Sequence, residues 1–245
     1  MDRSAGVIMP AAGRGARMGS ATAKQMLTID GATVLEHTLR RIIGLPGVQH
    51  VVIPADPALS DRIRRIIHNV RRDPGCATRA EVEWVPGGKE RMHSVAEGLQ
   101  VLRKHGTDLV IVHDAVRPCF PVAPVLQAIK VAAEKGAAIL AVPVRDTVKT
   151  VDAEFRVTST PDRKTLWLAQ TPQVFRTELL AEAYEKALRE DFPATDDASV
   201  AERAGYTVHV VEGSPDNIKI TWPPDLLFAA DWLRRNSHKM EQKRE

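Results

Sequence analysis

Residues 7–27 read VIMPAAGRGARMGSATAKQML, and this stretch decides the fold. A short apolar run of the kind found in buried strands ends at Pro10. Three glycines, two arginines and Lys24 follow it within fifteen residues. Open α/β sheets bind their ligands at the carboxyl ends of the strands, so a basic, glycine-rich loop directly after a first strand predicts a ligand site there.

The loop matches neither of the two common phosphate-binding patterns. Met18 stands where a dinucleotide fingerprint needs its third glycine, and no lysine follows Gly19 as a P-loop requires. Its glycines still allow backbone N–H groups to turn inward and form an anion-binding nest. Arg14, Arg17 and Lys24 add full positive charges, so a polyphosphate is the expected ligand. The alternative is a solvated turn with incidental basic residues.

The rest of the chain alternates between β-rich runs and helical stretches. We expect strands at residues 6–9, 48–53, 82–85, 109–113, 138–144, 208–211 and 218–221, and helices at 33–45, 59–70, 91–103, 124–135, 176–190, 197–205 and 224–235. Thr33 and Glu36 form a capping-box signature, and LVIVH at 109–113 is typical of a strand buried on both faces. The pattern predicts an α/β fold, a Rossmann-like three-layer α/β/α arrangement around a mostly parallel, mixed sheet.

Residues 145–175 interrupt this alternation. They are polar and mixed, with weak β character at 147–151 and 155–158. We expect them to leave the sheet as a protruding β-arm. The arm is inserted in a single domain that covers residues 1–236. Residues 237–245 lack an apolar face and are expected to form a flexible tail.

Composition excludes several classes of protein. The net charge of +3 comes from 34 basic and 31 acidic residues, a balance that does not favour a nucleic-acid partner. No apolar run approaches the roughly 20 residues of a membrane helix. Cys76 and Cys119 provide neither a disulfide framework nor the spacing of a metal site. Residues 1–5 lead directly into the first strand and leave no room for a signal peptide, so a cytoplasmic location is expected.

Seven motifs in order carry a resemblance to a known family. They are PAAGRGARM with the following KQ, GGKERMHSV, VHDAVRP, PVRDTVK, TPQVF, TDDAS and DNIKIT, and they span residues 10–221. In this order they resemble the 2-C-methyl-D-erythritol 4-phosphate cytidylyltransferases, nucleotidyltransferases of the non-mevalonate isoprenoid pathway.

The resemblance implies a specific reaction. The phosphate of methylerythritol phosphate attacks the α-phosphate of CTP, and pyrophosphate leaves. Because this nucleophile is already anionic at neutral pH, no general base is required; the reaction needs alignment and cancellation of negative charge. Arginines and lysines supply part of that charge. Mg²⁺, bound mainly through the CTP phosphates rather than by a protein metal site, supplies the rest.

The family's functional positions map onto matching residues here. The resemblance implies catalytic roles for Arg17, Lys24, Arg163 and Lys219. It implies nucleotide binding by Pro10, Ala11, Ala12, Gly13, Gly15, Gly88, Arg91, Ser94, Asp114 and Ala115, and substrate binding by Asp114, Arg117, Thr147, Arg163, Thr171, Thr195 and Lys219. In the family, Arg163 is reached across a subunit boundary through the arm, which implies a homodimer. Lys89 departs from the pattern, since some relatives carry an acidic residue there.

Simpler roles exist for several of these residues. Asp114 could cap a turn, Thr195 stands at an expected helix N-cap, and Arg163 could be solvated. Lys219 lies between two isoleucines on an expected strand and so points to the opposite face from both; an edge-strand lysine that blocks aggregation would look the same.

Two other functions remain open. The first is a cytidylyltransferase acting on ribitol 5-phosphate or another sugar phosphate. The second is a nucleotide-binding regulatory protein without catalysis, which is disfavoured because Arg17, Lys24 and Lys219 are all present.

Overall fold

A seven-stranded sheet forms the centre of the protein. The computed structural model describes residues 3–13, 22–73 and 80–241, with side chains up to residue 236. The sheet has the order β11-β7-β10-β6-β1-β4-β5, and its strands are β1 (Ala5–Ile8), β4 (Val48–Ala55), β5 (Glu81–Pro86), β6 (Leu109–Val112), β7 (Ala137–Pro143), β10 (Trp167–Arg176) and β11 (His209–Glu212). All neighbours are parallel except β10, which runs antiparallel to both β6 and β7. The expected mostly parallel, mixed sheet is confirmed.

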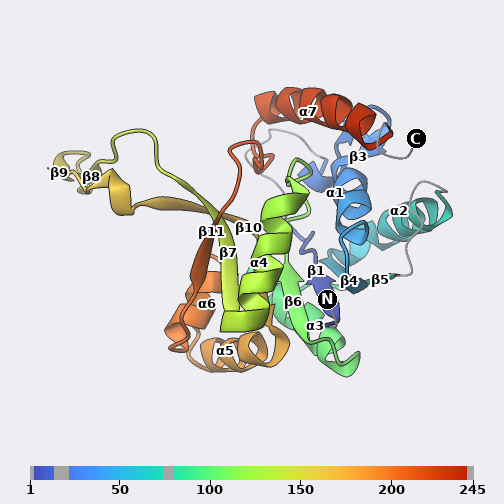
Figure 1. Ribbon diagram of the computed structural model, residues 1–245, viewed down its shortest axis with the longest axis horizontal. Coiled ribbons are helices and arrows are strands. Elements are labelled where there is room, and N and C mark those ends of the chain that lie inside the picture. The colour runs from blue at the N-terminus through green and yellow to red at the C-terminus, as the bar shows by residue number, and fades with distance from the viewer. Residues whose placement is uncertain (1–2, 14–21, 74–79, 242–245) are drawn as a thin grey trace.

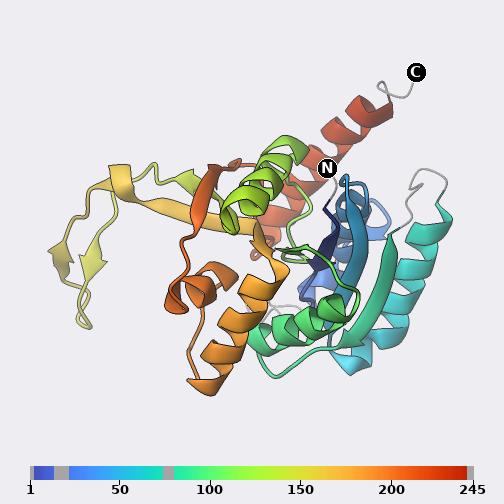
Figure 2. The same cartoon turned by 60° about the horizontal axis from the view of Figure 1, so that its bottom comes forward.

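Helices cover both faces of this sheet (Figures 1 and 2). One face carries α1 (Val34–Ile43), α2 (Ser60–Arg72) and α4 (Val122–Lys135); the other carries α3 (Arg91–Lys104), α5 (Thr177–Arg189) and α6 (Asp197–Arg203). The last helix, α7 (Pro223–Glu241), packs on the small hairpin β2–β3 (Thr28–Ile29 and Ala32–Thr33). Single turns of 3-10 helix lie at Lys24–Met26, Pro57–Leu59 and Arg163–Thr165. None of the described helices has the length and apolar character needed to cross a membrane.

The pleat of the strands divides the core into two layers. Along β6, Leu109 and Ile111 pack with α1, α2 and α4, whereas Val110 and Val112 pack with α3, α5 and α6. Successive side chains of a strand point to opposite faces, which is why a continuous apolar run suits a strand covered on both sides. All four residues are buried, as expected from the sequence.

Helix caps confirm one expectation and correct another. The Thr33 hydroxyl accepts a hydrogen bond from the Glu36 N–H, so the signature does start α1. Thr195, however, is not the N-cap of α6. The N-cap is Asp196. Its carboxylate accepts a hydrogen bond from the Ser199 N–H, and the Ser199 hydroxyl accepts one from the Asp196 N–H. A carboxylate caps as well as a hydroxyl does, and the TDD run offered both.

The expected arm exists but is shorter than residues 145–175. It leaves the sheet after Pro143, carries the two-stranded ribbon β8–β9 (Thr150–Val151 and Val157–Ser159) and returns at Trp167 (Figures 1 and 2). Residues 167–175 belong to β10, near the middle of the main sheet. The polar residues Gln170, Thr171 and Gln173 conceal this strand in the sequence. They are buried because each has hydrogen-bond partners inside the protein.

Two further expectations near the C-terminus are corrected. Residues 218–221 form no strand; the Ile220 N–H instead donates a hydrogen bond to the Val116 carbonyl, which links two loops. The last helix extends to Glu241, so it enters the segment predicted as a tail after residue 236. The apolar stripe that predicts a helix ends earlier than the backbone hydrogen bonding does.

The contact between α3 and β1 provides a test of the packing. A Cβ on Gly98 would lie 2.7 Å from Cγ2 of Ile8, a β-branched side chain with little freedom to move. We expect Gly98→Val to lower the free energy of unfolding by about 1–3 kcal/mol through overpacking, measured by urea denaturation. Glu97→Val, on the exposed face of the same helix, is the matched control. Equal stability of the two variants would contradict this account of the interface.

Candidate functional site

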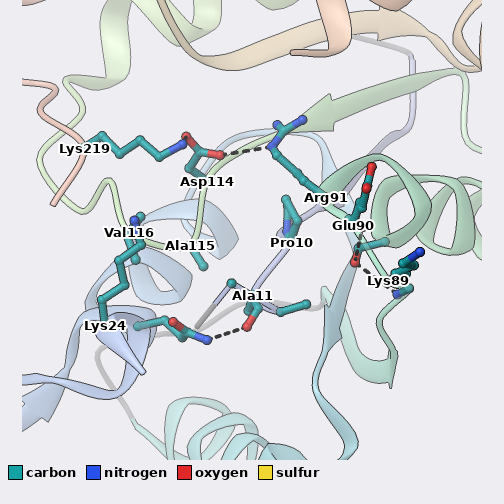
Figure 3. A pocket seen from close by; sticks show the side chains of 15 residues that line it. Pro10, Ala11, Lys24, Lys89, Glu90, Arg91, Asp114, Ala115, Val116 and Lys219 are labelled. Atoms are coloured by element: carbon teal, nitrogen blue, oxygen red, sulfur yellow. Dashed lines mark hydrogen bonds and ion pairs between the residues drawn. The ribbon is translucent and has the colours of Figure 1, made fainter. Parts of the chain in front are cut away.

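A pocket lies at the carboxyl ends of β1 and β6. Five parts of the chain line it: the residues after β1, the 3-10 turn at Lys24, the loop into α3, the segment after β6, and Lys219 (Figure 3). Its lining consists of Pro10, Ala11, Ala12, Gly13, Lys24, Gln25, Gly88, Lys89, Glu90, Arg91, Ser94, Asp114, Ala115, Val116 and Lys219. Eleven of these are residues that the sequence analysis assigns to the site. Gly15 and Arg17, also assigned there, lie outside the described residues.

The first loop is held in place before it reaches Gly13. The Ala11 N–H donates to the Pro54 carbonyl, which continues the pairing of β1 with β4 past the end of the strand. From the other side, the buried amide of Gln25 donates to the Ala11 carbonyl. Gln25 is a positioning residue that the sequence analysis did not assign, although it lies in the quoted KQ pair. The glycine-rich loop therefore begins from a fixed point.

The loop into α3 depends on Ser94 and on two glycines. The Ser94 hydroxyl accepts from the Gly88 N–H and donates to the Glu90 carbonyl, each at 3.1 Å. A Cβ on Gly88 would lie 2.3 Å from the Cβ of His93, so only glycine fits. Ser94 thus shapes the wall of the pocket by holding the turn that brings Gly88 there. A Cβ on Gly87 would also crowd Ala12 of the first loop, at 3.0 Å.

Asp114 lies at the centre of the charged part of the pocket. Its carboxylate is 3.0 Å from the Lys219 ammonium, 3.3 Å from Nε of Arg117 and 3.5 Å from Nε of Arg91. Lys219 and Arg91 approach it from opposite sides (Figure 3). Its side chain is 8% exposed, against 40% for Lys219. One buried anion therefore draws together three cations, one of which also extends toward solvent.

The charges outweigh the effect of burial on Asp114. Burial alone would raise the pKa of a carboxyl group, but the positive charges of Arg91, Lys219 and Arg117 hold the pKa of Asp114 well below its usual range. Asp114 is therefore ionised at any pH at which the protein functions. For Arg117 burial is the stronger influence, and it lowers the pKa of that guanidinium.

Lys219 is positioned by its neighbours in the chain. The buried side chain of Asn217 donates to the Thr171 carbonyl at 2.8 Å, and the Asn217 carbonyl accepts from Arg117 at 2.7 Å. On the other side, Ile220 is buried beneath α7. The lysine is therefore directed at Asp114 although residues 218–221 form no strand. Asn217 is a second positioning residue that the sequence analysis did not assign, within the quoted DNIKIT motif.

The remaining assigned residues lie outside the first pocket. Thr171 is behind it, where its hydroxyl accepts from the Asp114 N–H. Arg117 lines a second pocket that shares Lys219 and also includes Arg145 and Gln170. Thr147 and Arg163 are exposed on the arm, and the Arg163 guanidinium donates to the Arg145 carbonyl. Thr195 precedes α6 and lines neither pocket.

The carboxylates of the first pocket do not form a metal site of their own. Asp114 is engaged by three cations, and Glu90 is the other carboxylate in the lining. Elsewhere among the described residues, His50, Glu81 and His105 lie close enough to consider a metal. The two imidazoles are stacked at 4.1 Å with their planes 22° apart, so their lone pairs do not converge on one ion.

His113, directly before Asp114, provides a test of burial at the site. Burial lowers the pKa of His113 to about 4, and the neutral ring pairs with the Arg117 carbonyl. The unfolded chain then binds more protons than the folded protein between about pH 6.5 and pH 4, so stability falls as the pH falls through this window. From pH 7 to pH 5, His113 accounts for a loss of about 2 kcal/mol.

We expect His113→Gln, whose amide can donate to the same carbonyl, to lose that much less stability between pH 7 and pH 5 in urea titrations. His68→Gln, the same substitution at an exposed position of α2, is the matched control. An unchanged pH dependence in His113→Gln would mean that His113 has the same pKa in the folded protein as in the unfolded chain, and would contradict this account of its burial.

Comparison with known proteins identifies the family. The model of the 2-C-methyl-D-erythritol 4-phosphate cytidylyltransferase family matches residues 5–235. Relatives of that name from Bacillus velezensis and Geotalea uraniireducens are 40% and 42% identical, covering 94% and 93% of this chain and 96% and 95% of their own lengths. The crystal structure of 4-diphosphocytidyl-2C-methyl-D-erythritol synthase from Anaerococcus prevotii is similar with a TM-score of 0.81 and 30% identity, over 95% of this chain and 96% of that one. This chain therefore belongs to the 2-C-methyl-D-erythritol 4-phosphate cytidylyltransferase family.

Proposed function

We propose that the protein transfers the cytidylyl group of CTP to 2-C-methyl-D-erythritol 4-phosphate, which gives 4-diphosphocytidyl-2-C-methyl-D-erythritol and pyrophosphate. Membership of the family supports this reaction. The observation that carries it to this chain is the cluster of Arg91, Arg117 and Lys219 around Asp114, beside the glycine-rich loop and Lys24. This cluster is a site built for anionic groups.

The chemistry requires alignment rather than proton transfer. An oxygen of the acceptor phosphate forms a bond to the α-phosphorus of CTP, the bond from that phosphorus to the bridging oxygen breaks, and pyrophosphate leaves with the electron pair. Because the acceptor phosphate is already ionised, no side chain has to remove a proton. We assign Lys24 and Arg17 to the charge that develops on the nucleotide phosphates, and Lys219 to the acceptor phosphate.

The second pocket is suited to the acceptor. Arg117, Arg145 and Lys219 give it positive charge, and Lys219 belongs to both pockets. An acceptor phosphate held by Lys219 would therefore lie at the boundary with the nucleotide pocket, where an in-line attack can occur. Gln170, Asp146 and Glu212 line the same pocket and offer partners for sugar hydroxyl groups.

We propose Mg²⁺ as the cofactor, held mainly by the CTP phosphates. The donor set fits this arrangement, because Asp114 already lies beside three cations, whose charge opposes the binding of a metal ion there. When bound, the ion would neutralise triphosphate charge and favour departure of pyrophosphate. Orienting the two phosphates is then the task of the cationic side chains.

Pyrophosphate release by the purified protein tests the function. With CTP and Mg²⁺, we expect release when methylerythritol phosphate is added and none with ribitol 5-phosphate. Release only with ribitol 5-phosphate would replace the acceptor but keep the chemistry. No release with either acceptor would contradict catalysis and favour a regulatory nucleotide-binding protein.

The same assay tests the charge-cancellation argument. We expect Lys24→Ala and Lys219→Ala each to lower kcat by about a hundredfold or more, the cost of removing one group that stabilises transition-state charge. Lys130→Ala, an exposed lysine of α4, is the control and keeps wild-type turnover. Circular dichroism and thermal melts establish that the variants fold. Near-normal rates in both site variants would contradict the proposed roles.

We further propose that the protein is a cytoplasmic homodimer in which the arm of one subunit reaches the site of the other. The arm exposes Phe155, Val151 and Val157, with Phe155 86% exposed, which suits a surface that a second copy covers. Arg163 lies on the same arm and outside the pockets of its own chain. In a dimer of this kind, Arg163 and Thr147 would serve the partner's acceptor phosphate. A buried free thiol at Cys119 is compatible with a reducing compartment.

Complementation between two inactive variants tests the shared site. A subunit with Arg163→Ala has an altered arm but an intact pocket. A subunit with Lys219→Ala has an altered pocket but an intact arm. After mixing and subunit exchange, a mixed dimer contains one site with both residues intact. We expect activity to reappear, up to about a quarter of the wild-type value if subunits assort freely and half of the dimers are mixed, since a C2 dimer has two equivalent sites. If exchange is verified by differently tagged subunits and no activity returns, Arg163 does not act across the interface.

A further inference from the structure

A fully buried carboxylate lies directly behind the site. Asp197 is the first residue of α6 and is 0% exposed. Its two oxygens accept a paired contact from Arg91, at 3.1 Å and 2.7 Å, and one of them also accepts the hydroxyl of Tyr184 at 2.5 Å. The function proposed above gives Asp197 and Tyr184 no task, and neither of them lines the two pockets described above.

Arg91 joins this buried pair to the site. Its Nη atoms contact Asp197, and its Nε faces Asp114 at 3.5 Å. Its guanidinium therefore lies between two carboxylates, with one plane and one orientation that satisfies both. A planar donor with several N–H groups can be fixed in this way, whereas a lysine in the same place could not.

The protonation states favour a permanent arrangement. Burial, followed by the charge of Asp197, raises the pKa of Tyr184 well above its ordinary value, so its hydroxyl remains a donor. Burial alone would lower the pKa of Arg91, but Asp197 and Asp114 raise it above the usual value. Tyr184 therefore stays neutral and Arg91 stays positively charged throughout the pH range of the enzyme.

Asp197 itself is held by the start of α6. Asp196 caps this helix, and the buried amide of Gln173, on β10, donates to the Asp196 carboxylate and accepts from the Ala198 N–H. Gln173 lies on the strand that also carries Thr171, the hydrogen-bond partner of the Asp114 backbone. The main sheet therefore places Asp114 and Asp197 on either side of Arg91.

We propose that Asp197, supported by Tyr184, is a positioning residue for the reaction. It holds the Arg91 guanidinium so that Arg91 faces one oxygen of the Asp114 carboxylate, while the other oxygen remains paired with Lys219. This inference rests on the proposed function. Without Asp197, Arg91 loses its second anion and turns fully toward Asp114, where it competes with Lys219. The lysine then leaves the boundary between the two pockets, where the acceptor phosphate has to be held.

The test is steady-state kinetics of Asp197→Asn and Tyr184→Phe with CTP and methylerythritol phosphate. We expect Asp197→Asn to lower kcat about ten- to hundredfold, since displacing a group at the site by about 1 Å can lower the rate by as much as about a hundredfold. The KM for CTP is expected to change less than about threefold. Tyr184→Phe keeps the charge of Asp197 and lowers kcat less, in the same direction. Wild-type protein measured alongside separates the two ideas: an inactive wild type refutes the proposed function, and an active wild type with kcat unchanged in Asp197→Asn refutes this inference.

A matched variant separates positioning from simple loss of helix stability. Ser199→Ala removes a contact of the capping box at the start of α6 without touching Arg91. We expect it to lower the Tm yet keep the kcat of the folded enzyme. A loss of kcat in Ser199→Ala as large as in Asp197→Asn would show that integrity of α6, rather than the position of Arg91, is what matters, and would overturn the proposal.

If Asp197→Asn fails to fold because Arg91 is left buried without its partner, the double variant Arg91→Gln/Asp197→Asn keeps the proposal testable. It removes both charges of the buried pair, and such replacements are often well tolerated. Because Asp197 acts through Arg91, we expect the double variant to have the kcat of Arg91→Gln alone. A further loss of kcat when Asp197→Asn is added to Arg91→Gln would show that Asp197 acts by another route, and would overturn the proposal.

Discussion

The attraction of several cations to one buried carboxylate is the interaction on which this site depends. Arg91, Arg117 and Lys219 would repel one another if Asp114 were absent, and the buried Arg117 guanidinium would lose the carboxylate beside it. Asp114 resolves this conflict, yet together with Asp197, the partner of Arg91, it supplies only two negative charges against three positive ones. The excess positive charge remains available to a polyphosphate, so the same contacts that hold the side chains together also make the pocket attract its ligand.

The sheet accounts for where this carboxylate lies. Asp114 comes two residues after β6, at the carboxyl edge where parallel strands end, and the adjacent antiparallel strand β10 places Thr171 against its backbone. β10 buries the polar residues Gln170 and Thr171 near the centre of the sheet, which is possible because both have hydrogen-bond partners. Both also accept hydrogen bonds from Asn217, so β10 is connected to the segment that carries Lys219.

The fold and the site could be predicted from the sequence wherever a local pattern of residues reports directly on the structure or the chemistry. Apolar alternation predicted most strands and helices, and the motifs predicted eleven residues that line the pocket. It failed at β10, where Gln170, Thr171 and Gln173 look like loop residues because their partners are distant in the chain. It also missed Gln25 and Asn217, whose roles depend on contacts with other segments. No local signal identifies a residue that acts through such a partner.

A reaction without a general base places unusual weight on these supporting contacts. When catalysis is alignment of two phosphates and cancellation of their charge, no side chain needs a tuned proton affinity, but each cation needs a fixed position. Surface lysines and arginines have many rotamers and give little of that precision. A buried ion pair adds little stability, since removing its ions from water is costly. Its advantage is a single orientation, and the pair of Arg91 with Asp197 supplies this to the centre of the site.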